Sequence, residues 1–90
     1  MTKIIIRRHV CIIKRARQRD LLLMDADSDC ESPGTPNRTI QILRGLRGKR
    51  LLRALLHEGI HAVDWNISER KVDLLAQNLA RLLLATGWHQ

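Results

Sequence analysis

Short runs of β-branched residues, separated by charged and polar positions, fill the first half of the chain. "TKIIIRRHVCIIKRARQ", residues 2–18, has two such runs around residues 7–9, which predicts two short strands or one long bent strand. "RTIQILRG", residues 38–45, alternates isoleucine with polar residues and predicts another strand. The prolines, glycine and asparagine of "CESPGTPN", residues 30–37, predict a loop. We therefore expect residues 1–47 to form a small antiparallel sheet of about three strands.

The second half has the periodicity of helices. In residues 49–64 apolar side chains recur at steps of three and four, which predicts a helix. A break follows, and Ser68 is a suitable N-cap for a second helix that ends near Gly87. Its expected apolar stripe comprises Val72, Leu75, Ala76, Leu79, Leu82 and Leu83. Strands followed by two antiparallel helices, in residues 48–90, indicate an α+β fold in a single domain over residues 1–90.

The composition of the chain indicates which partners and which cellular compartment to expect. The formal net charge is +7, which favours an anionic partner and weak nucleic-acid association through a basic surface. Trp65 and Trp88 are the only large aromatic residues, so base stacking is disfavoured. Two distant cysteines, Cys11 and Cys30, suit a reducing cytoplasm, and no run approaches the ~20 apolar residues of a membrane span. A small aliphatic core leaves room for stabilisation by a metal or by a homodimer.

The chemistry of the chain is concentrated in "LLHEGIHAVDW", residues 55–65. On a helix, His57 and His61 lie one above the other, roughly 6 Å apart, and can converge on one Zn²⁺ ion. Glu58 points about 100° around the helix from His57, where it can reach a metal-bound water. This pattern predicts that His57 and His61 are zinc ligands and that Glu58 is the general base.

Three carboxylates are candidates for the third zinc ligand. Asp64 follows His61 by three residues and lies on the same helical face, where it could bind the metal or orient an imidazole. Glu69 and Asp73 are both on the second helix, at about 70° and about 110° from the centre of its apolar stripe. Glu69 points more directly inward, so we expect Glu69 as the third ligand, with Asp73 and Asp64 as the alternatives.

The motif carries a resemblance to a known family. "HEGIH", residues 57–61, is the signature of the zincin metallopeptidases, and an acidic residue on the next helix resembles the gluzincin arrangement. Residues 30–83 are similar to small SprT-like zinc metallopeptidases of phages and prophages, and more distantly to ImmA/IrrE-type peptidases. The resemblance implies a zinc-dependent peptidase acting on a protein or peptide substrate, with zinc held by His57 and His61 and with Glu58 as general base.

The sequence departs from these families at several positions. Metzincins have a third histidine where this chain has Ile67, and SprT-type proteins use a downstream histidine, for which only His89 remains. Many zincins stabilise the oxyanion with a tyrosine, which is absent here, so His9 and Arg38 are the candidates for that role. Cys30 is a candidate fourth zinc ligand.

Two other functions remain as alternatives at this point. One is a zinc-stabilised zincin-like protein without catalytic activity, consistent with the small size and the missing tyrosine. The other is a basic nucleic-acid-associated module, motivated by the net charge.

Overall fold

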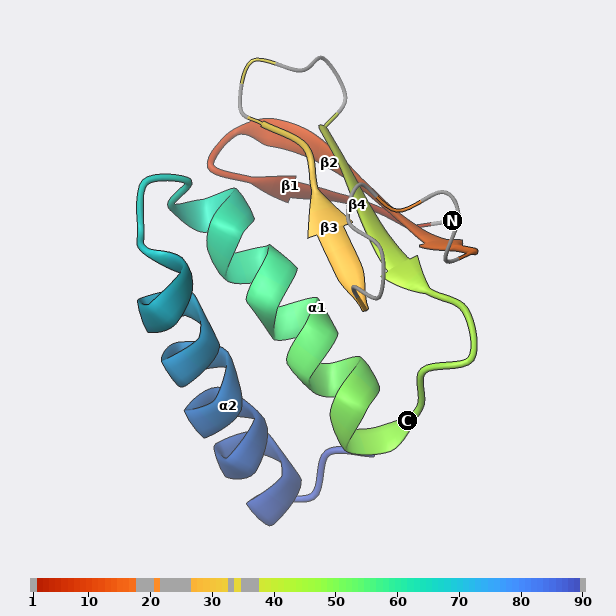
Figure 1. Ribbon diagram of the computed structural model, residues 1–90, viewed down its shortest axis with the longest axis vertical. Coiled ribbons are helices and arrows are strands. Elements are labelled where there is room, and N and C mark those ends of the chain that lie inside the picture. Colours follow the sequence, from red (N-terminus) through yellow and green to blue (C-terminus); the bar gives the residue numbers. More distant parts are fainter. Residues whose placement is uncertain (1, 18–20, 22–26, 33, 35–37, 90) are drawn as a thin grey trace.

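The computed structural model describes residues 2–17, 21, 27–32, 34 and 38–89. Four strands precede two helices: β1 Thr2–Ile6, β2 His9–Ala16, β3 Ser28–Cys30, β4 Arg38–Leu43, α1 Gly48–Val63 and α2 Glu69–Ala85 (Figure 1). This confirms the predicted α+β class and the order of strands before helices. Within the described residues, neither helix combines the length and apolarity that crossing a membrane requires.

The sheet is mixed and has four strands, rather than about three antiparallel ones. Its order is β1-β2-β4-β3, with β1–β2 and β3–β4 antiparallel and β2–β4 parallel. β4 therefore lies between β2, to which it is parallel, and the edge strand β3, to which it is antiparallel. β3 has only three residues, "SDC", too few and too polar for an alternating pattern to be recognised. Of the predicted loop at residues 30–37, Cys30 belongs to β3, and residues 33 and 35–37 lie outside the described residues.

A tight turn joins β1 to β2 and decides between the two interpretations of the first segment. Arg7 and Arg8 have φ angles of 50° and 67°, and Ile6 pairs with His9 across the turn. Positive φ at both central residues is typical of the two-residue turns that match the twist of a β-hairpin. The segment is therefore a hairpin of two strands.

The core lies between the sheet and α1, which packs over β3 and β4. Along β4 burial alternates, so Ile40 and Ile42 are buried on the same face. The buried cluster comprises Cys11, Cys30, Ile40, Ile42, Leu46, Leu51, Ala54 and Ala62. One face of α1 is thereby fixed against the half of the sheet that contains the edge strand β3.

The second helix begins and ends near the predicted residues. Ser68 is the N-cap, and its Oγ accepts a hydrogen bond from the Lys71 amide at 3.2 Å. The face that α2 buries only partly matches the predicted stripe: Val72 and Ala76 are buried as predicted and Leu83 is partly buried, while Ala80 is buried in addition. Leu75, Leu79 and Leu82 of the predicted stripe stay 37%, 38% and 58% exposed. Small side chains let α2 approach α1 closely, and the larger leucines lie beside that contact.

A buried arginine connects the sheet to the C-terminal end of α1. Arg38 is 7% exposed and donates hydrogen bonds from Nη1 to the Ala62 carbonyl at 2.9 Å and from Nη2 to the His61 carbonyl at 3.2 Å. Its Nε donates to the Glu31 carbonyl at 2.7 Å. Carbonyls in the last turn of a helix lack intrahelical partners and carry partial negative charge, so a guanidinium is well suited to them. Arg38 therefore fixes the end of α1 that carries His61.

Replacing Arg38 with alanine should destabilise the fold, because the mutation leaves three carbonyls without their donor. We expect Arg38→Ala to lower the free energy of unfolding by about 3 kcal/mol. The matched control is Arg44→Ala at an exposed position, which should change it by less than about 0.5 kcal/mol. Urea denaturation followed by circular dichroism measures both, and equal effects would contradict the assigned role of Arg38.

Candidate metal centre

Two imidazoles converge beside the contact between the helices. α1 places His57 and His61 one turn apart, with their Nε2 atoms 3.2 Å from each other and their ring centroids 4.9 Å apart. Their side chains are 21% and 11% exposed. At this distance at most one of the two nitrogens can carry a hydrogen without repulsion from the other. Two facing lone pairs, in contrast, form a site for a shared cation.

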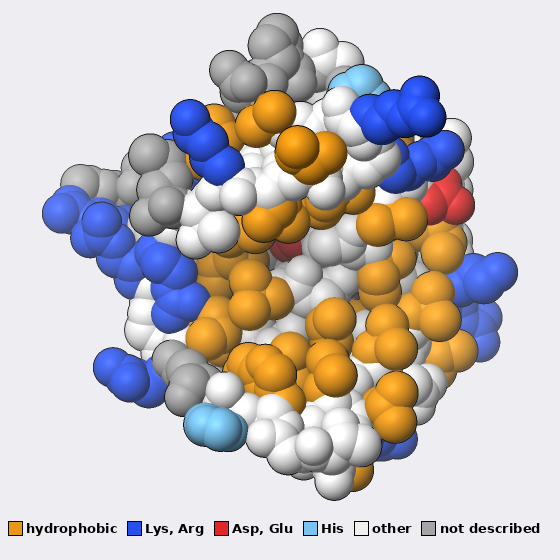
Figure 2. All heavy atoms as spheres, turned by 180° about the vertical axis from the view of Figure 1, so that it is seen from behind, with side chains coloured by type: hydrophobic (Ala, Val, Ile, Leu, Met, Phe, Trp, Pro, Cys, Tyr) orange, Lys and Arg blue, Asp and Glu red, His pale blue; other side chains and the backbone are white. Residues whose placement is uncertain are grey.

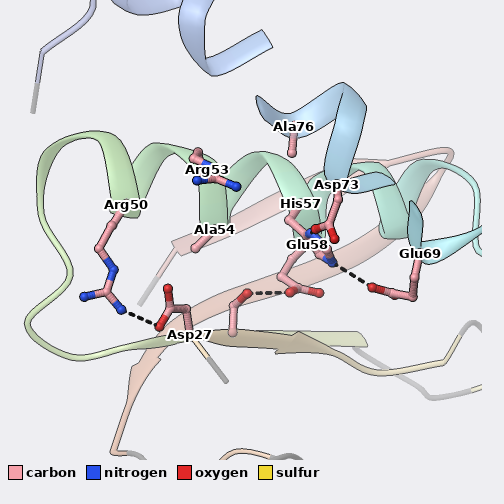
Figure 3. Close-up of a pocket in the computed structure, with 10 residues that line it drawn as sticks. Asp27, Arg50, Arg53, Ala54, His57, Glu58, Glu69, Asp73 and Ala76 are labelled. Atoms are coloured by element: carbon pink, nitrogen blue, oxygen red, sulfur yellow. Dashed lines mark hydrogen bonds and ion pairs between the residues drawn. The ribbon is translucent and has the colours of Figure 1, made fainter. Parts of the chain in front are cut away.

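Glu69 completes the group from the first turn of α2. Its Oε1 lies 2.5 Å from His61 Nε2, and its Oε2 lies 3.3 Å from His57 Nε2 (Figure 3). Ser68 caps the helix immediately before it, which fixes where the first turn begins. One ligand atom from each of His57, His61 and Glu69 lies within 4.8 Å of the others, so this group could hold a metal ion.

The other two candidate ligands occupy different places. Asp73 lies one turn further along α2, and its Oδ1 is 3.0 Å from His57 Nδ1, the ring nitrogen that faces away from His61. A carboxylate at that nitrogen fixes the tautomer that leaves Nε2 free to bind a metal. Asp64 is the C-cap of α1, and its Oδ1 accepts a hydrogen bond from the Asn66 amide at 3.2 Å. The structure therefore places Asp73 behind His57 and Asp64 at a turn.

Glu58 is held by a residue that the sequence did not indicate. Its carboxylate is buried at 4% exposure, and Oε2 accepts a hydrogen bond of 2.5 Å from Ser28 Oγ on β3 (Figure 3). A pocket of about 640 Å³ is lined in part by Ser28, His57, Glu58 and Glu69. Ser28 escaped recognition because it follows a polar segment and belongs to a strand too short to show periodicity.

The other residues singled out in the sequence do not belong to the group formed by His57, His61 and Glu69. His9 is exposed at the start of β2, and exposed His89 has Nδ1 3.2 Å from the Gly87 carbonyl. The guanidinium of Arg38 is buried against backbone carbonyls and a tryptophan ring rather than lining the pocket. Burial raises the pKa of Cys30 to about 11, partly opposed by Arg38, so its thiol is neutral at pH 7. Cys30 is not part of the metal-binding group found among the described residues.

The environment of Glu58 favours its neutral form. Burial raises the pKa of Glu58 above its ordinary value, while the Ser28 hydrogen bond and then the two histidines act in the opposite direction. A carboxyl group whose pKa is higher in the folded state stabilises the fold at low pH. That contribution is lost as the pH rises through the raised pKa.

The metal-free Glu58→Gln variant should therefore be more stable than the metal-free wild type at pH 8, where the buried carboxylate is ionised. We expect its melting temperature to be a few degrees higher. The difference should shrink toward zero as the pH falls to 4, because the carboxyl group becomes neutral. Thermal melts in excess chelator at the two pH values measure it, and a difference independent of pH would contradict the assigned cost of ionisation.

Comparisons of the chain with protein-family models, with curated proteins and with solved structures found no match. The functional argument therefore rests on the group formed by His57, His61 and Glu69, and on the buried carboxylate of Glu58 beside it.

Proposed function

We propose that the protein is a zinc-dependent peptidase in which His57, His61 and Glu69 bind the metal. The supporting observation is the spacing of their ligand atoms. Ligands at 2.0–2.1 Å from a tetrahedral zinc lie about 3.3 Å from one another. The distance between the two Nε2 atoms is 3.2 Å, and that between His57 Nε2 and Glu69 Oε2 is 3.3 Å. Glu69 Oε1 lies only 2.5 Å from His61 Nε2, so Oε2 is the oxygen of Glu69 that we propose as the ligand.

The ligand chemistry also fits zinc. Two imidazoles and one carboxylate make up a common donor set of catalytic zinc sites, which keep a fourth position open for water. Asp73 supports the choice, because its contact with His57 Nδ1 orients the ring toward the group. His61 Nδ1 is buried without a hydrogen-bond partner among the described residues. A metal bound at Nε2 would leave the hydrogen of this ring on Nδ1, so His61 lacks the orienting acceptor that Asp73 gives to His57.

Glu58 is the proposed general base. Zinc, when bound, lowers the pKa of a coordinated water to about 7 and so supplies a nucleophile at neutral pH. Ser28 engages Oε2 of Glu58, which assigns proton transfer to Oε1. Glu58 would accept the proton of the attacking water and then deliver it to the amine that leaves. Its raised pKa, caused by burial, makes the carboxylate a stronger base for the first of these steps.

The position of β3 suggests how a peptide substrate would be aligned. β3 is an outer strand of the sheet and carries Ser28, which contacts Glu58. An extended peptide can add to the outer edge of a sheet through backbone hydrogen bonds. Such a peptide beside β3 would run past the pocket that Glu58 lines.

The metal content of protein purified without added zinc tests the ligand assignment. We expect one zinc ion per chain, and its loss in His57→Ala. The matched control is His89→Ala, which removes an exposed histidine outside the pocket and should retain the zinc. Elemental analysis measures the zinc content, and equal zinc in both variants would contradict the site.

Zinc should also stabilise the folded protein. At a concentration 100-fold above its dissociation constant, zinc should stabilise the wild type by about 2.7 kcal/mol, seen as a higher melting temperature.

Cleavage of an unfolded protein such as casein tests the role of Glu58. The Glu58→Gln variant should retain zinc and lose at least about 100-fold in rate, because glutamine cannot accept the proton. Proteolysis that survives in this variant would exclude the mechanism. A wild type that binds zinc and melts on chelation but cleaves nothing would instead support a zinc-stabilised protein without catalytic activity.

A further inference from the structure

The face seen from behind carries apolar side chains that the metal centre does not use. Hydrophobic side chains spread over it from the sheet toward the helices, around a hollow near its middle (Figure 2). An exposed apolar area of this kind on a small protein indicates a contact with another molecule. From strand register and helix angles we assign three sets of residues to this face, one each on α2, β1–β2 and α1.

On α2, the exposed leucines lie on the side opposite the metal. At 100° per residue, Leu75, Leu79 and Leu82 centre about 130° around the helix from Glu69 and Asp73. The buried face of α2, centred on Ala76, separates the two groups. One side of this helix therefore serves the metal group, while the other presents a row of leucines to the solvent.

The sheet contributes the part of its inner face that α1 leaves uncovered. Ile4 pairs with Cys11, and Ile13 pairs with Ile40, so these isoleucines lie on the same face as the core. α1 packs over β3 and β4, at the other end of the sheet. Ile4 is accordingly 38% exposed, and Ile13 is partly buried.

The side of α1 that faces away from the metal group contributes one residue, Leu55, to this surface. Leu55 is partly buried against the core, about 120° around α1 from His61 and so away from the metal group. We define the rear apolar surface as Ile4, Ile6, Ile13, Leu55, Leu75, Leu79 and Leu82.

The margins of this surface are basic. Lys and Arg side chains flank the apolar area on both sides in Figure 2, where acidic side chains are few. Arg7 and Arg8 are exposed on the β1–β2 turn, and Arg7 Nη1 donates a hydrogen bond of 3.0 Å to the carbonyl of Val63. This contact places the turn beside the end of α1. The formal net charge of the whole chain is +7.

We propose that the rear apolar surface docks an acidic amphipathic segment of a partner protein, with apolar residues on one side and Asp or Glu along its margins. A second copy of this chain would bring two basic margins together, each on a molecule of net charge +7. A nucleic acid offers no comparable apolar side. A flat lipid surface fits poorly against a hollowed face. This proposal stands independently of the metal and of peptidase activity.

Two synthetic amphipathic peptides of equal length test the proposal. Both have the same leucine face, but one has Glu at its margins and the other has Lys. Fluorescence anisotropy of labelled peptides with the full chain should show the Glu peptide binding at least about tenfold more tightly than the Lys peptide. Raising the salt from about 50 to about 300 mM should weaken the Glu peptide severalfold.

A matched pair of variants locates the binding site. Leu79 and Leu84 are 38% and 36% exposed on α2 but lie about 140° apart around its axis. Leu79→Gln should weaken the Glu peptide about tenfold, as expected for removal of a central apolar contact. Leu84→Gln should leave the affinity unchanged. Circular dichroism spectra of both variants should match the wild type.

Four outcomes would overturn the proposal. The first is equal binding of the two peptides, or of neither. The second is an equal effect of the two leucine substitutions. The third is a dimer in sedimentation equilibrium that Leu79→Gln dissociates, which would assign the surface to a second copy. The fourth is binding to phosphatidylglycerol vesicles that Leu79→Gln abolishes, which would assign it to a membrane.

Discussion

The close approach of α2 to α1 determines where the candidate metal ligands meet. His57 and His61 belong to α1, but Glu69 reaches them only because α2 begins directly after the turn and packs along α1. Val72, Ala76 and Ala80 form the buried face of α2, and two of these three residues have the smallest side chain that still favours a helix. Larger residues there would separate the helix axes and remove the carboxylate from both imidazoles.

The carboxylate of Glu58, buried beside two histidines, is costly to ionise. Burial of Glu58 opposes its ionised form, and the hydrogen bond from Ser28 only partly compensates. A buried carboxylate without any hydrogen-bond donor would destabilise the fold further. The hydrogen bond from Ser28 on β3 supplies one such donor. It also couples the edge strand of the sheet to the helix that carries the histidines.

Features that depend on residues close together in the chain could be predicted from the sequence. The two helices, the Ser68 cap and the helical spacing of His57 and His61 each depend on residues within a turn or two of one another. The same periodicity predicted that Glu69 points inward, but its side chain is 71% exposed even though it contacts both histidines. Features that depend on long-range pairing were not accessible. β3 is too short to show alternation, and β2 pairs in parallel with β4, a strand more than twenty residues further along the chain.

The apolar stripe of α2 shows a limit of periodicity itself. The spacing placed Leu75, Leu79 and Leu82 toward the core, whereas the neighbouring helix selects the alanine face. Hydrophobic spacing shows that a helix has an apolar side, but it does not show how much of that side a single neighbouring helix can cover. Ser28 illustrates the same limit for the site, since nothing in its immediate sequence indicates that it faces Glu58.

The three candidate metal ligands all fall within residues 57–69, on one helical hairpin. The entropic cost of closing a chain segment rises only with the logarithm of its length, so joining two ends this close in sequence requires little loss of freedom. An ion held there would link two adjacent helices rather than distant parts of the chain. The proposed site would therefore need only this hairpin to form, and not the slower long-range strand pairing.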